Sequence, residues 1–139
     1  MFKHILVPTD LTDNTFEALN IAVKMALHEQ SRITLLHIIE TIADTEFEEF
    51  EDFYLKLKRR AQKKMEQMLA GYQQELLSIH REIAYGKRVN EIVKFADQNA
   101  IDLIVLSSHR VEVTESSKGW GTISYKVGIL SPCPVMLVK

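Results

Sequence analysis

The stretch Ile101-Asp102-Leu103-Ile104-Val105-Leu106 has the composition of a β-strand that is buried on both faces, because apolar residues follow one another there almost without alternation. Three other short runs share this pattern: Ile5-Leu6-Val7-Pro8, residues 33–39 and residues 135–138. Buried strands of this kind are typical of parallel sheets that are covered by helices on both sides. The chain is therefore expected to build a mixed α/β domain.

Segments with helical periodicity alternate with these strands. Apolar residues recur every three or four positions in four segments: residues 16–29, 47–76, 89–96 and 123–130. A weakly alternating run from Ile79 to Tyr85 ends at Gly86 and predicts one more strand. Strands and helices in this order imply parallel strands joined by right-handed crossovers. We expect one α/β domain over residues 1–139, an open, doubly wound, five-stranded parallel sheet with helices on both faces.

Composition and charge exclude several classes of protein. The net charge of −2 provides no overall field that would attract nucleic acid or a membrane surface. The single cysteine, Cys133, excludes an internal disulfide and suits a reducing compartment. Residues 1–8 lack the apolar core and cleavage site of a signal peptide, and no apolar run approaches the roughly 20 residues of a membrane helix. A cytoplasmic location is the expectation.

The helix predicted over residues 47–76 carries most of the charge. It begins with an acidic block from Glu46 to Asp52, and its outer face is basic. The basic residues are Lys56, Lys58, Arg59, Arg60, Lys63 and Lys64. Because acidic and basic residues share one helix, a solvated face partly paired with nearby carboxylates is favoured over a nucleic-acid surface. The five histidines lack metal-ligand spacing, and no catalytic motif is present, so neither a metal site nor a catalytic residue is expected.

Gly121-Thr122 stands directly before the last predicted helix. Open parallel sheets bind ligands beyond the carboxyl ends of their strands, where loops 8–15 and 107–122 and the segment after Ile38 would meet. A helix N-terminus offers unpaired N–H groups and the positive end of a dipole, which attract anions. The glycine would let the backbone approach a phosphate. The alternative interpretation is that Thr122 is an ordinary N-cap in a plain loop.

Several segments, in their order and spacing, resemble one known family over almost the whole chain. Residues 5–10, Ile-Leu-Val-Pro-Thr-Asp, look like its opening strand and loop, and residues 35–38, Leu-Leu-His-Ile, like its second strand. Gly86 before a helix, residues 102–106 and residues 132–138 are similar to its later strands and its ending. This is the universal stress protein family. The resemblance implies its Rossmann-like fold, which is related to the adenine nucleotide alpha hydrolases.

Family members that bind ATP carry the motif Gly-x2-Gly-x9-Gly-[Ser/Thr] after the fourth strand. This chain resembles the motif only in part: Gly121-Thr122 matches its last pair, whereas Ser107 and Arg110 stand at its first two glycines. Ten residues, not nine, separate Arg110 from Gly121. Ser107 adds only a small side chain, and Arg110 either fills the phosphate space or reaches across it as a cationic partner. The implied ligand is ATP or AMP, and the alternative is that no ligand binds.

The resemblance also implies site residues and a role. The implied nucleotide-binding residues are Pro8, Thr9, Asp10, Ile38, Leu106, Ser107, His109, Arg110, Gly121, Thr122, Ile123 and Ser124. The implied role is regulatory and non-catalytic, in a stress response that a bound adenine nucleotide modulates. The alternative is an ATP-binding switch with slow hydrolysis. A homodimer through the last strand and an unknown protein partner are also implied, with no nucleic acid and no membrane as partners.

Overall fold

The computed structural model describes residues 1–72, 79–110 and 122–139, and these residues form a parallel sheet flanked by helices. The strands are β1 (His4–Pro8), β2 (Arg32–Glu40), β3 (Ile79–Gly86), β4 (Leu103–Ser107) and β5 (Val135–Val138). The helices are α1 (Thr15–Glu29), α2 (Glu51–Ala70), α3 (Arg88–Gln98) and α4 (Ile123–Leu130), with a short 3-10 turn, η1 (Phe47–Phe50), before α2.

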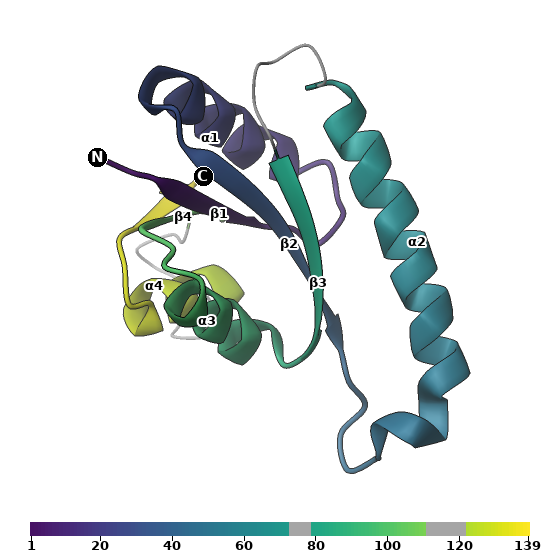
Figure 1. Cartoon of the computed structure of the whole chain (residues 1–139). Helices are drawn as coiled ribbons and strands as arrows, with labels where there is room; N and C mark the ends of the chain where they lie inside the picture. Colours follow the sequence, from purple (N-terminus) through teal and green to yellow (C-terminus); the bar gives the residue numbers. More distant parts are fainter. Residues whose placement is uncertain (73–78, 111–121) are drawn as a thin grey trace.

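The order of the strands across the sheet is β3-β2-β1-β4-β5, and every neighbouring pair is parallel. Helices α1 and α2 lie on one face of this sheet, and α3 and α4 lie on the other (Figure 1). The predicted doubly wound α/β fold is therefore confirmed. After β1 the chain builds the sheet outward through β2 and β3, and it then returns to place β4 on the other side of β1. The carboxyl ends of β1 and β4 thus form the switch point of the sheet.

The central strands send alternate side chains into the two helical layers. Ile5 and Val7 of β1 pack with Leu19 of α1, whereas Leu6 between them packs with Ile92 of α3. All four side chains are buried. Because both faces of the strand are covered, neither set needs to be polar, and the strand reads as a continuous apolar run. The same reason explains the apolar sequence of β4.

The helix predicted over residues 47–76 is wrong at its start, because α2 begins only at Glu51. Phe50 has φ −127° and ψ 28°, which separates the 3-10 turn η1 from the α-helix. The ring of Phe47 stacks on Tyr54 with ring centroids 4.9 Å apart and meets Tyr85 of β3 edge-on at 5.2 Å. These ring contacts hold the turn against the sheet edge, and they outweigh the helical periodicity of the sequence. Residues 73–78 of the predicted helix lie outside the described residues.

The strand predicted at residues 101–106 is confirmed, but it begins at Leu103. Asp102 lies just before it and uses its carboxylate on the neighbouring strand. The two carboxylate oxygens accept the N–H groups of Lys3 at 2.8 Å and His4 at 3.1 Å. The one acidic residue in this apolar run therefore fixes the start of β1 beside β4.

Candidate functional site

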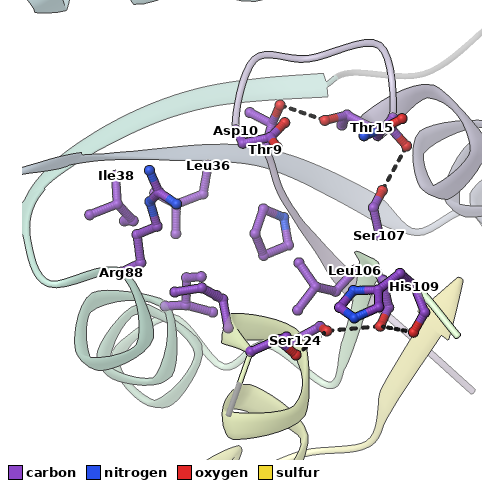
Figure 2. Close-up of a pocket in the computed structure, with 16 residues that line it drawn as sticks. Thr9, Asp10, Thr15, Leu36, Ile38, Arg88, Leu106, Ser107, His109 and Ser124 are labelled. Carbon is purple, nitrogen blue, oxygen red and sulfur yellow. Dashed lines mark hydrogen bonds between the residues drawn. The ribbon is translucent and has the colours of Figure 1, made fainter. Parts of the chain in front are cut away.

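A cavity of about 320 Å³ opens at the switch point of the sheet (Figure 2). This volume lies at the lower end of the range of small-molecule sites, about 300 to 1,000 Å³. The ends of β1, β2 and β4, the loop before α1 and the starts of α3 and α4 all contribute to its wall. The lining residues are Pro8, Thr9, Asp10, Asn14, Thr15, Leu36, Ile38, Arg88, Ile92, Leu106, Ser107, Ser108, His109, Thr122, Ile123 and Ser124.

Most of the residues predicted from the sequence are brought together in this wall. They are Pro8, Thr9, Asp10, Ile38, Leu106, Ser107, His109, Thr122, Ile123 and Ser124. Arg110 is exposed and is not among the described residues that line the cavity. Gly121 lies outside the described residues. The prediction that these residues hold a nucleotide stays a prediction.

The loop between β1 and α1 is held by its own short side chains. The hydroxyl oxygen of Thr9 accepts the N–H of Leu11 at 2.9 Å and shares a hydrogen bond with the hydroxyl of Thr15 at 2.8 Å. These bonds hold Leu11 in the left-handed region, at φ 69°. Asp10 Oδ1 accepts both the N–H and the hydroxyl of Thr12, at 2.9 and 2.6 Å. The loop therefore forms a preorganised wall of the cavity.

Ser107 closes the switch point from the other side. Its hydroxyl donates to the carbonyl oxygen of Asn14 at 2.8 Å, which ties the end of β4 to the loop before α1 (Figure 2). Such a hydrogen bond contributes about 0.5–1.5 kcal/mol to stability. The serine at the first glycine position of the motif thus engages its side chain in a structural contact. The position remains on the cavity wall.

Hydroxyl groups line the end of the cavity at the start of α4. The hydroxyl oxygens of Ser108 and Ser124 are 2.8 Å apart, and that of Thr122 lies 3.4 Å from Ser124. Thr122 occupies the N-cap position of α4 but makes no side-chain capping bond. The alternative interpretation, that Thr122 is the N-cap, is therefore correct in position, but the side-chain capping bond of an ordinary cap is missing. The first N–H groups of α4 receive no bond from this side chain, which leaves them open to an acceptor in the cavity.

The opposite end of the cavity is apolar and carries a cation. Leu36, Ile38 and Ile92 are buried and present aliphatic surface. Beside them lies Arg88, the first residue of α3 (Figure 2). Its Nε is 3.3 Å from Glu40 Oε1. Both members of this ion pair are about half exposed, so it adds little to stability. The contact lies beside the apolar end of the cavity, which Arg88 lines.

His37 of β2 contacts the backbone at the start of the loop that follows β1. Its Nδ1 lies 2.9 Å from the carbonyl oxygen of Thr9. Burial lowers the pKa of this imidazole below its usual range, and the nearby charge of Arg88 lowers it further, against the opposing effects of the Thr9 carbonyl and Asp10. His37 is therefore neutral at pH 7, and its Nδ1–H donates to Thr9. His37 is thus a hydrogen-bonded structural histidine in a largely apolar strand.

A model of the universal stress protein family matches residues 1–139. The chain belongs to the universal stress protein family. Universal stress protein YxiE of Bacillus subtilis is 27% identical over 149 residues, with both chains covered in full. A universal stress protein of Thermus aquaticus is 31% identical over 143 residues, again with both chains covered in full. The resemblance on which the sequence-based predictions rest is therefore confirmed.

Solved structures of universal stress proteins share the fold. UspA from Lactobacillus plantarum aligns with a TM-score of 0.75 at 26% identity, over 99% of this chain and 98% of that chain. MJ0577 from Methanocaldococcus jannaschii aligns with a TM-score of 0.79 at 28% identity, over 100% and 96%. A universal stress protein from Archaeoglobus fulgidus, solved in complex with dAMP, aligns with a TM-score of 0.69 at 15% identity, over 100% and 98%. This last match supports the shared fold alone.

Some lining residues of this universal stress protein are absent from the sequence-based prediction. They are Asn14, Thr15, Leu36, Arg88, Ile92 and Ser108. Arg88 offered a usable signal, because it opens a helix directly after a strand, and in a parallel sheet such helices begin at the ligand edge. Leu36 and Ile92 offered none, since the same residue types fill the core elsewhere.

Two further features of the described part of this universal stress protein concern metal sites and membrane-spanning helices. Residues 1–72, 79–110 and 122–139 contain no group of three or more His, Cys, Asp or Glu placed to hold a metal ion. Within the same ranges, no helix combines the length and apolarity that crossing a membrane requires. The polar groups of the described cavity lining are hydroxyl, backbone, amide, imidazole, carboxylate and guanidinium groups.

Proposed function

We propose that this universal stress protein is a non-catalytic regulatory protein that an adenine nucleotide, AMP or ATP, modulates by binding in the switch-point cavity. The observation that carries the proposal is the division of the cavity into an apolar end and a hydroxyl-lined end at the start of α4. A nucleotide has the same division, with a flat base at one end and phosphate at the other. The regulatory partner of this universal stress protein is another protein. Its location is the cytoplasm, a reducing compartment that suits a chain with a single cysteine.

The apolar end suits the base. Leu36, Ile38 and Ile92 offer buried aliphatic surface against which a ring can pack, and Pro8 adds the face of its own ring. Arg88 stands beside them with donors only, which suits the ring-nitrogen acceptors of a purine. Adenine would gain both packing and polar contacts at this end.

The hydroxyl end suits ribose and phosphate. The hydroxyls of Ser108, Thr122 and Ser124 form a cluster that can donate to phosphate oxygens. The uncapped start of α4 adds backbone N–H groups and the positive end of the helix dipole. An Archaeoglobus fulgidus protein of the same fold was solved with dAMP, so the fold is able to hold such a ligand. The assignment to this chain rests on its own residues.

The geometry favours binding over hydrolysis. Hydrolysis of ATP needs a base that reaches the attacking water. Asp10 is the one carboxylate among the described lining residues. Its Oδ1 already accepts two hydrogen bonds from Thr12. A carboxylate used to hold a loop is poorly placed for turnover. We therefore favour a binding role and keep slow hydrolysis as the second candidate.

Thermal unfolding in the presence of AMP, ATP, CMP and inorganic phosphate tests the proposal. A ligand that binds only the folded state adds about 2.7 kcal/mol to the free energy of unfolding at 100 times its Kd. We expect AMP and ATP to stabilise the protein and CMP to do so much less, because a pyrimidine fills less of the apolar end. Calorimetric titration then gives each Kd.

Two outcomes would change this assignment. If millimolar AMP and ATP leave the unfolding midpoint unchanged, the adenine-nucleotide proposal is wrong. No ADP should accumulate if the role is binding alone. If ATP stabilises the protein, ADP accumulates in the same sample and an independently purified sample repeats this, the hydrolytic switch replaces the binding role. Stabilisation by phosphate alone to the same extent would remove the base from the recognition.

We also propose a homodimer through β5. This strand is an edge of the sheet, its side chains Val135 to Val138 are partly exposed, and an edge strand presents unpaired N–H and C=O groups to a second copy. Light scattering on the protein as it elutes from a size-exclusion column should give twice the mass of one chain at micromolar concentration. A single-chain mass throughout the micromolar range would contradict this pairing.

A further inference from the structure

Tyr125 of α4 reaches from its helix to the loop that follows β4. Its hydroxyl donates to the carbonyl oxygen of His109 at 2.6 Å. Its ring also meets the imidazole of His109 edge-on, with ring centroids 6.1 Å apart and an interplanar angle of 76°. One side chain therefore contacts His109 at both its backbone and its ring.

His109 is an exposed residue that lines the hydroxyl end of the cavity. Figure 2 shows its imidazole at the same end of the cavity as Ser124. In either tautomer the ring carries an N–H, which can donate to a phosphate oxygen. An exposed side chain samples several rotamers, and a contact that restricts it lowers the entropy cost of binding. The residue that holds His109 therefore bears on phosphate recognition.

The two residues before His109 are tied to other elements. The hydroxyl of Ser107 is engaged on the loop before α1. The N–H of Ser108 donates to the end of β5 at 2.8 Å, and its hydroxyl oxygen lies 2.8 Å from that of Ser124. That hydroxyl is also 3.4 Å from the carbonyl oxygen of His109, which is a longer contact than the one from Tyr125. Tyr125 thus makes the closer bond at the loop residue that lines the cavity.

Lys139 directs the hydroxyl proton of Tyr125. Its Nζ donates to the phenol oxygen at 2.8 Å and lies 4.6 Å from the centroid of the same ring. An ammonium group only donates hydrogen bonds, so the phenol oxygen is the acceptor and its own proton is left for the carbonyl of His109. Hydrogen bonds in such a chain polarise one another. The cation therefore strengthens the bond from Tyr125 to His109.

We propose that Tyr125 is a positioning residue for the phosphate of the bound nucleotide and that it acts through His109. The proposal rests on the adenine-nucleotide function proposed above. The hydroxyl of Tyr125 fixes the loop backbone, and its ring limits the rotation of the imidazole, so that the imidazole N–H stays available to the phosphate. Tyr125 is not among the described residues that line the cavity, so its effect on the ligand passes through its neighbour.

A double-mutant cycle on AMP binding tests this role. Tyr125→Phe keeps the ring and removes the hydroxyl, and His109→Ala removes the imidazole. We expect Tyr125→Phe to weaken AMP binding roughly threefold to tenfold, the size of one hydrogen bond. In the His109→Ala protein, the same change should alter the Kd by no more than about twofold. Calorimetric titration of AMP into the four proteins gives the comparison.

Adenosine, which lacks the phosphate, separates positioning from a general structural effect. Tyr125→Phe should leave the Kd of adenosine within about twofold of the wild-type value. Tyr72→Phe is the matched control, because it also removes a tyrosine hydroxyl. That hydroxyl donates to Asn20 Oδ1, and neither residue is among the described cavity lining, so the control should change neither Kd. Thermal unfolding without ligand checks that each variant is folded.

The results distinguish this role from the function on which it rests. If the wild type binds neither AMP nor ATP, the proposed function is wrong, and the role of Tyr125 is wrong with it. If the wild type binds AMP, three results overturn the positioning role alone. They are an unchanged Kd for AMP in Tyr125→Phe, an equal loss for adenosine, and an equal loss for AMP when His109 is already alanine.

Discussion

Replacing Thr122 with aspartate should weaken AMP binding at least roughly 30-fold while making the free protein more stable. Thr122 stands at the N-cap of α4 with extended backbone and no side-chain capping bond. Aspartate is a preferred N-cap and contributes about 0.5–2 kcal/mol when it bonds the N–H groups of the first turn. Its charge also suits the positive end of the helix dipole. The variant should therefore unfold at a higher temperature in the absence of ligand.

The same carboxylate would lie at the end of the cavity assigned to phosphate, because Thr122 lines it. Two unit charges about 4 Å apart at an effective dielectric of 20 repel by about 4 kcal/mol. Even half of that repulsion corresponds to about a 30-fold change in Kd. The variant thus separates stability from binding, since the two change in opposite directions.

Thr122→Asn is the matched control. Asparagine caps a helix about as well as aspartate but carries no charge. It should raise the unfolding midpoint to a similar extent and leave the Kd for AMP within a few-fold of the wild-type value. Calorimetric titration of AMP into the three proteins gives the comparison. An aspartate variant that binds AMP as tightly as the asparagine variant would place the phosphate away from the start of α4.

The sheet was predictable because its central strands are buried on both faces. Residues 5–8 and 103–106 are continuous apolar runs, and such runs between amphipathic segments leave few arrangements other than a covered parallel sheet. The start of α2 was not predictable in the same way. The rings of Phe47, Tyr54 and Tyr85 come from two distant parts of the chain, and local periodicity carries no information on their contact.

The candidate site, like the fold, could be predicted from the sequence only in part. The loops after β1 and β4 could be predicted as walls, because the switch point of an open sheet lies beyond those strands. The bond from Ser107 to the carbonyl of Asn14 joins residues 93 positions apart, and only the fold brings them together. Arg88 enters the wall because α3 begins at the same edge. A motif match finds residues near one loop, whereas this wall draws on several elements.

Gly86 links the fold to this site through its backbone conformation. It ends β3 two residues before Arg88, and its φ is +145°, which residues with a side chain rarely adopt. A Cβ at this position would lie 2.7 Å from Glu91 Oε1 and 2.8 Å from its Cγ. The glycine therefore permits both the sharp entry into α3 and the packing of Glu91 against the chain.

Gly86→Ala should lower the free energy of unfolding by roughly 2–4 kcal/mol, because a disfavoured backbone conformation alone costs about 1–3 kcal/mol and Glu91 must also move. For a chain of this size the unfolding midpoint should fall by roughly 10 °C. Gly71→Ala is the matched control. Gly71 has φ −68°, and a Cβ there meets nothing within 4 Å, so alanine should be neutral or stabilise by about 0.4–1 kcal/mol.

Adding Glu91→Ala to Gly86→Ala separates the two causes of the loss. Alanine at 91 removes the crowded side chain, so the double variant should recover the part due to contact and keep the part due to φ. Denaturant unfolding of the wild type, Gly86→Ala, Glu91→Ala and the double variant gives the free energy of unfolding of each. If Gly86→Ala unfolds like the wild type, the positive φ of Gly86 is not required for the entry into α3.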